Sequence, residues 1–191
     1  MDAAKVKKLD DPRTLRALAH PLRLRLLGAL RTDGPATVTT LASAVDEAIP
    51  LVSYHLRQLA EHGFIEQAPE LAKDRRETWW KASHDFTSWS MTDFLDTPER
   101  LDAVAVLQRE IFRRHVARIE QFYEHAHNWD EEWLAASEMS DVRLTLTPAE
   151  LKQMTSEMWE VIERWRRREP TPGAGSADVI LYAFPGGRGS A

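Results

Sequence analysis

One short segment carries the side-chain types that proteins use to read a nucleic-acid groove. Residues 50–62, PLVSYHLRQLAEH, repeat apolar residues at spacings of three and four, which predicts an amphipathic helix. Its inner side holds Val52, Leu56 and Leu59, and its outer side holds Pro50, Ser53, Tyr54 and Arg57. Hydroxyl and guanidinium groups on one helix face suit base edges and phosphates in a major groove. The segment predicts a DNA-contacting helix, in which Arg57 meets either a guanine or a phosphate.

A second cluster of cations lies in a predicted β-hairpin. Residues 64–67 and 76–82 are rich in β-branched or aromatic side chains and predict two strands, with residues 68–75 as the loop between them. The cations of this loop and its edge are Lys73, Arg75 and Arg76. Cations at a hairpin tip bind phosphates or enter a minor groove of DNA. We therefore expect these cations to fix the position of the protein on the DNA more than its preference for a base sequence.

The elements that position these residues form one module over about residues 12–84. Leucines at helical spacing predict helices over 13–19 and 21–31, and Thr37 predicts the N-cap of a further short helix. That helix and the helix of residues 50–62 are joined by a tight connection, which is typical of a helix-turn-helix. Helices followed by a hairpin predict a winged helix.

The same stretch resembles a known family. The segment Ala-His-Pro-Leu-Arg at 19–23 and the pattern Ser-x-His-Leu-x-x-Leu-x-x-x-Gly at 53–63 are similar to the winged helix-turn-helix of ArsR-like bacterial transcription regulators. The resemblance covers about residues 12–82. It implies a homodimeric repressor or activator that binds DNA and responds to an effector. The founding members sense metalloids through a Cys-x-Cys pair, and this chain has no cysteine, which excludes arsenite-type thiolate sensing.

The composition of the chain excludes several classes of protein and of functional site. The 191 residues carry a net charge of −5, with the excess of acid in residues 85–191. The absence of cysteine excludes a disulfide scaffold, thiolate metal sites and cysteine nucleophiles. No apolar run is long enough to span a membrane, and the start lacks the apolar stretch of a secretory signal, so we expect a soluble cytoplasmic protein without a membrane partner.

Residues 85–191 predict a second region built around a long helix. The helix runs from 98 to about 127, and residues 142–184 predict a strand, a helix and a strand. The expected fold class is mainly α with small β elements: a winged helix-turn-helix domain, a long dimerisation helix and a small α/β C-terminal extension. A projecting amphipathic helix needs a partner for its apolar seam, and the usual partner is a second copy. The expected dimer interface is Leu101, Val104, Ile111, His115, Ile119 and Phe122.

The predicted function is a sequence-specific, dimeric DNA-binding regulator, a repressor that binds a double-stranded operator and is modulated by a small molecule. Two alternatives stay open: a winged helix that binds a protein and has no operator, and a repressor that senses a metal through histidine and carboxylate groups. Glu124 and His127, three residues apart, would be candidate ligands for the second. No cofactor, metal or catalytic residue is expected, because no Gly-rich phosphate loop or nucleophile elbow precedes the glutamates of residues 140–185.

Overall fold

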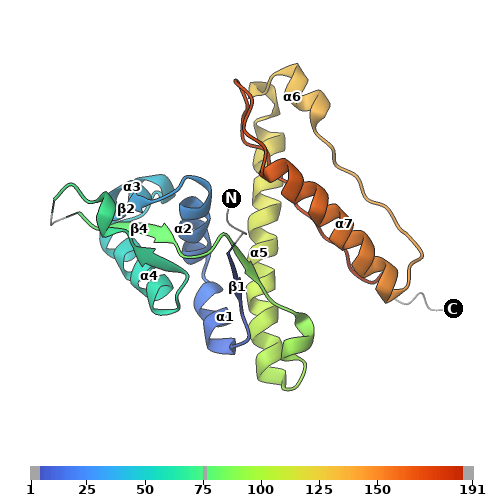
Figure 1. Ribbon diagram of the computed structural model, residues 1–191, viewed down its shortest axis with the longest axis horizontal. Helices are drawn as coiled ribbons and strands as arrows, with labels where there is room; N and C mark the ends of the chain where they lie inside the picture. Colours follow the sequence, from blue (N-terminus) through green and yellow to red (C-terminus); the bar gives the residue numbers. More distant parts are fainter. Residues whose placement is uncertain (1–4, 75–76, 187–191) are drawn as a thin grey trace. The chain divides into compact units, whose positions relative to one another are not determined.

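A computed structural model describes residues 5–74 and 77–186 of the chain (Figure 1). It divides into two compact units, Met1–Glu124 and His125–Ala191. The sequence suggests a boundary after residue 84, whereas this division keeps the long helix with the N-terminal unit. The physical reason is that the first part of that helix packs on the first helix of the unit.

Four helices open the N-terminal unit: α1 (Pro12–Leu18), α2 (Pro21–Thr32), α3 (Val38–Val45) and α4 (Ile49–Glu61). Local sequence explains where three of them start. The carboxylate of Asp11 accepts hydrogen bonds from the first turn of α1, the imidazole of His20 does so for α2, and the hydroxyl of Thr37 does so for α3. Gly63 follows α4 with a φ of 66°, the left-handed conformation that commonly ends a helix and that glycine adopts without strain.

Two small sheets complete the module. Strands β2 (Ala36–Thr37), β4 (Trp79–Ala82) and β3 (Ile65–Gln67) form an antiparallel sheet in that order, with Ile65 opposite Ala82. This confirms the predicted hairpin and adds a third strand before α3. A short 3-10 helix, η1 (Pro69–Leu71), lies in the hairpin loop. Strand β1 (Val6–Lys8), in the segment before the first helix, pairs in parallel with β5 (Phe86–Ser88).

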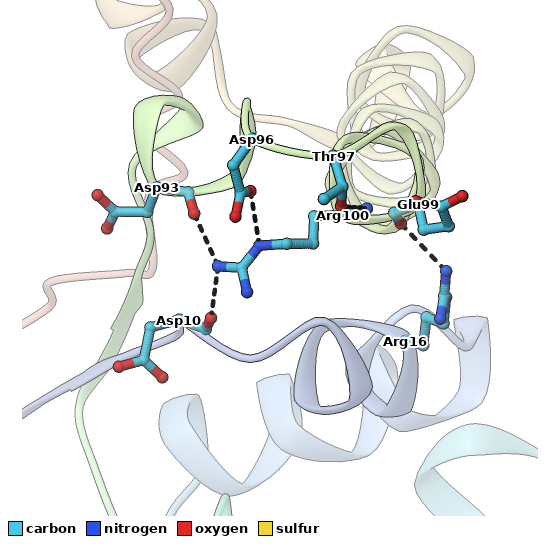
Figure 2. Close-up of polar contacts among 7 residues, drawn as sticks. All are labelled: Asp10, Arg16, Asp93, Asp96, Thr97, Glu99 and Arg100. Atoms are coloured by element: carbon cyan, nitrogen blue, oxygen red, sulfur yellow. Dashed lines mark hydrogen bonds and ion pairs between the residues drawn. The ribbon is translucent and has the colours of Figure 1, made fainter.

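The long helix α5 (Pro98–Glu124) follows a 3-10 helix, η2 (Met91–Phe94). Arg100 ties its first turn to η2 and to the N-terminal segment that precedes α1 (Figure 2). The guanidinium pairs with the carboxylate of Asp96 at 2.9 Å and donates to the carbonyls of Asp93 and Asp10 at 2.8 and 3.2 Å. On the neighbouring side, Arg16 of α1 donates to the carbonyl of Glu99 at 3.1 Å. These contacts anchor the start of α5 on the N-terminal segment and α1.

The hydrophobic core is built from the helices of the module, its three-stranded sheet and the first half of α5. The largest fully buried side chains include Phe64, Phe94, Leu26, Leu56 and Leu59. In the middle of α2, a Cβ added to Gly28 would collide with the guanidinium of Arg114. The bare backbone at Gly28 lets this arginine of α5 approach α2 and donate to the carbonyl of Leu24 at 2.7 Å.

The C-terminal unit contains the 3-10 helix η3 (Ala126–Asn128) and the helices α6 (Glu131–Ala136) and α7 (Pro148–Arg166). Helix α7 starts at a capping box, in which Thr147 and Glu150 satisfy each other's backbone N–H groups. The strands predicted at 142–146 and 178–184 are not formed, which corrects the expected α/β extension. Alternation of apolar residues makes a strand only where another backbone offers a ladder, and the described part of this unit offers none to either segment.

In the parts of the chain that the structure describes, no helix has the length and apolar character needed to cross a bilayer.

Candidate nucleic-acid interface

Helix α4 separates its two faces sharply. Val52, Leu56 and Leu59 are fully buried against the rest of the module. On the opposite side, Tyr54 is 50% exposed and Arg57 is exposed, while Ser53 is half-buried. The two faces therefore lie as the sequence predicts, and the outer face combines a phenol, a hydroxyl and a guanidinium.

The start of α4 is open, with Pro50 exposed in its first turn. Its N-cap is Ala48, and no residue that the structure describes places a side-chain cap on the helix. Helices α1, α2, α3 and α7 each have such a cap. Because the free N–H groups and the dipole of a helix start attract anions, this end of α4 suits a phosphate group.

The guanidinium of Arg57 folds back along its own helix. Its Nε donates to the carbonyl of Ser53 at 3.3 Å. One weak contact of this kind, at an exposed position, is easily exchanged for a stronger acceptor such as a phosphate or guanine O6 and N7. Ser53 and Arg57 thus lie side by side on the outer face, one turn apart.

The hairpin loop has a more mixed charge than the sequence suggests. Lys73 is exposed, but Glu77 reaches back into the loop and accepts hydrogen bonds from the backbone N–H of Lys73 at 3.1 Å and from the indole of Trp79 at 3.3 Å. Asp74 is exposed beside them. Arg75 and Arg76, the other two predicted phosphate contacts, lie outside the described residues.

Several arginines near the module's surface serve the fold. Arg31 donates to the carbonyl of His84 at 3.0 Å and to the hydroxyl of Thr87 at 2.8 Å, and burial lowers its pKa to about 10. Arg25 donates to the carbonyl of Val45 at the end of α3. Of the arginines in residues 13–31, these two hold helix ends and strands together, a role that composition alone does not reveal.

The predicted dimer interface maps onto α5 with one correction. Val104 is fully buried in the core of its own unit with Ala103 and Leu107, so it is not available to a second copy. Leu101 is 38% exposed, and the other predicted interface residues are half-buried: Ile111, His115, Ile119 and Phe122.

A further apolar stripe on α5 was not part of the predicted seam. Phe112, Val116 and Tyr123 are 44%, 52% and 58% exposed, and their spacings of four and seven place them on one face. The signal that would have found them is the second apolar periodicity of α5, displaced by one residue from the predicted one.

Metal ligation has no structural support in the described ranges. Within residues 5–74 and 77–186, no group of three or more His, Cys, Asp or Glu side chains is placed to hold an ion.

A comparison with protein families identifies part of this module. Residues 18–68 match the family model described as a helix-turn-helix domain. These residues form a helix-turn-helix domain. They include α2, α3, α4 and β3, so the match covers the elements that present the outer face of α4. The match confirms the helix-turn-helix part of the expected resemblance, and with the β3–β4 hairpin the winged-helix fold class is confirmed. No curated protein matches the chain in sequence.

Several solved structures are similar to the chain, and two of them are described as a transcriptional regulator or a possible one. One is the homodimeric winged helix-turn-helix domain Mb0332 from Mycobacterium bovis, a possible ArsR-family regulator, at 18% identity and a TM-score of 0.34, covering 59% of this chain and 82% of that one. Another is the transcriptional regulator PA4135, at 14% identity and a TM-score of 0.31, covering 79% of each chain.

A third is a mutant of Lactococcus lactis ZitR, at 13% identity and a TM-score of 0.30, covering 76% of this chain and 73% of that one. TM-scores this low do not support the transfer of any property to this chain.

Proposed function

We propose that the chain is a sequence-specific DNA-binding transcription regulator that acts as a dimer on a double-stranded operator. The observation that carries this proposal is the outer face of α4. One side of the helix is seated in the core, and the other offers Ser53, Tyr54 and Arg57 to solvent beside an uncapped helix start. A recognition helix needs this combination of a rigid inner face and donors and acceptors on its outer face.

Each outward residue has a distinct role in the proposal. Arg57 exchanges its bond to the Ser53 carbonyl for a guanine or a phosphate, and Ser53 and Tyr54 contact base edges near the helix start. Pro50 places the first turn of α4 against the sugar-phosphate backbone of the DNA. Lys73 on the hairpin loop binds phosphate and contributes affinity more than specificity.

The proposed dimer uses α5. Its stripe of Phe112, Val116 and Tyr123, together with half-buried Ile119, offers apolar surface to the same stripe of a second copy. A two-fold arrangement of this kind is self-complementary and presents two α4 helices to a palindromic operator. In this proposal the dimer is a cytoplasmic repressor.

An effector would act through the C-terminal unit. This unit exposes aromatic side chains of α7, including Trp159 and Trp165 at 47% and 62%. Exposed aromatic groups are suited to binding an apolar small molecule. Two glutamates of α7 serve the helix itself, since Glu150 closes the capping box and Glu163 pairs with Arg166 at 2.9 Å.

The decisive experiment selects bound fragments from genomic DNA with the purified full-length chain. We expect a palindrome with half-sites about one helical turn apart. Affinity for the selected duplex should fall steeply with salt, since phosphate contacts release counterions. Failure to enrich any sequence, together with salt-independent capture of a protein partner, would favour the alternative of a protein-binding winged helix.

A substitution sharpens this test. We expect Arg57→Ala to weaken binding to the selected duplex by about tenfold or more and to weaken binding to random DNA far less. The matched control is Arg113→Ala, which removes an exposed arginine of α5 that pairs with Glu110 at 3.0 Å. Equal losses on both duplexes would show that Arg57 contacts only phosphate.

The dimer has its own test. Val116→Asp places a charge in the stripe of α5 and should convert dimers to monomers in analytical ultracentrifugation. Val142→Asp, at a valine that is 78% exposed in the C-terminal unit, is the control and should leave the assembly unchanged. A Val116→Asp chain that stays dimeric would place the interface elsewhere.

A further inference from the structure

Two imidazole rings meet where the start of α2 approaches α4. His20 precedes α2 and His55 lies on the inner side of α4, with ring centroids 4.3 Å apart and planes tilted by 38°. His55 is 4% exposed and is the one buried polar residue in the described ranges. A buried polar group on the helix that faces DNA requires an account of its hydrogen bonds.

The ring of His20 acts as the N-cap of α2. Its Nδ1 accepts a hydrogen bond from the backbone N–H of Leu22 at 3.2 Å. An imidazole nitrogen accepts only when it carries no proton, so this cap exists only while Nδ1 of His20 is deprotonated. The neutral ring therefore carries its proton on Nε2.

The same reasoning applies to His55. Nη1 of Arg23 lies 3.4 Å from Nδ1 of His55. Because a guanidinium has donors and no acceptor, Nδ1 of His55 must be the acceptor and must be deprotonated. Nη2 of Arg23 also donates to the carbonyl of Arg16 at 3.4 Å, so one arginine of α2 links the end of α1 to α4.

The charges around the pair resist a further proton. Burial lowers the pKa of His20, and Arg23 adds to the effect, while Glu110 of α5 opposes it. Burial also lowers the pKa of His55, and His20 and Arg23 add to it. Tyr54 touches the ring of His55 edge-on, with centroids 5.0 Å apart. The cation of Arg23 therefore outweighs the one carboxylate that faces the pair in the described residues.

We propose that His20, Arg23 and His55 form a latch that holds α4 in its DNA-reading position only while both imidazoles are neutral. A proton on either Nδ1 removes an acceptor and places a second cation beside Arg23. Since both pKa values are lowered in the closed latch, the open state takes up protons more readily, and acid favours opening. This inference rests on the proposed function, because it assigns a pH response to the same helix face.

The first test measures affinity for the selected duplex at about pH 7.5 and about pH 5.5 at constant salt. We expect binding to be about tenfold weaker at the lower pH, the scale of effect that follows from losing one helix cap. The double variant His20→Asn and His55→Gln keeps side-chain acceptors that do not titrate, and it should lose most of this pH dependence. His62→Gln, at the end of the same helix, is the matched control and should behave like the unmodified chain.

Other outcomes of this test overturn the latch. Binding that strengthens at low pH would mean that protonated histidines contact phosphate. A pH response that disappears in His62→Gln would mean that His62, and not the latch, causes the response. A double variant that retains the full pH response would also overturn it, since the response would then come from other groups.

A second readout needs no DNA. Hydrogen exchange at the amide of Leu22 and along α4 should accelerate below about pH 6.5, the ordinary pKa of an imidazole, after correction for the intrinsic pH dependence of exchange. The double variant should show no such additional acceleration. If the chain binds no DNA but this acceleration is found, the proposed function fails while the latch stands. Corrected exchange that is independent of pH in the unmodified chain would overturn the latch itself.

Discussion

The N-terminal unit and the C-terminal unit differ in how their helices are stabilised. Helix α4 has no side-chain cap, yet three of its side chains are fully buried in a core shared with other elements. Helix α7 has a complete capping box and exposes Trp159 and Trp165. Within residues 125–186 no side chain is buried. Strong local signals are thus enough to define a helix, whereas a core requires residues that are distant in sequence.

This difference has a consequence for cooperativity. Residues that share a core unfold together, and a helix held by local contacts opens by itself at lower cost. A substitution in the N-terminal unit should therefore lower the global free energy of unfolding. A similar substitution in the C-terminal unit should change only the local stability of its own helix or turn. Three pairs of substitutions test this, and each pair has one member in the N-terminal unit and one in the C-terminal unit.

The largest effect is expected from the core. Leu56→Ala removes a fully buried side chain of α4 and should lower the free energy of unfolding by about 2–5 kcal/mol in urea denaturation. Val161→Ala in α7, at a side chain that is 45% exposed, should change it by less than about 0.5 kcal/mol. Comparable losses from the two variants would mean that α7 belongs to the same core.

The second pair compares glycines with positive φ. Gly63 has a φ of 66° at the end of α4, and Gly173 has a φ of 85° in the C-terminal unit. Alanine in this conformation costs about 1–2 kcal/mol, so Gly63→Ala should lower the unfolding midpoint. Gly173→Ala pays the same local strain but should leave that midpoint unchanged. A shift of the midpoint by Gly173→Ala would join the two units into one cooperative fold.

The smallest effect is expected from the helix caps. Thr37→Ala removes the hydroxyl that accepts from the backbone N–H of Thr40 at 3.2 Å, and it should cost about 1 kcal/mol of global stability. Thr147→Ala removes half of the capping box of α7 and should instead increase hydrogen exchange in the first turn of that helix. Global destabilisation by Thr147→Ala of the same size would contradict the distinction between the units.

The candidate site shows which of its features sequence reasoning can reach. The inner residues of α4 and the outward positions of Tyr54 and Arg57 follow from a period of 3.6 residues, and the structure has them so. The acidic side chain of Glu77 inside the hairpin loop and the histidine cap of α2 do not follow from any period. They depend on which backbone groups a turn brings within hydrogen-bonding distance.

Helix starts, helix faces and the β3–β4 hairpin were determined by the sequence itself, because capping, periodicity and turn chemistry act between residues a few positions apart. Tertiary structure alone decided three other features. Val104 became core because its part of α5 belongs to a helix that packs on α1, β1 became a strand because β5 lies beside it, and residues 142–146 and 178–184 stayed irregular because neither has a ladder partner among the described residues. Each outcome depends on a neighbour far along the chain, and no local pattern encodes the presence of that neighbour.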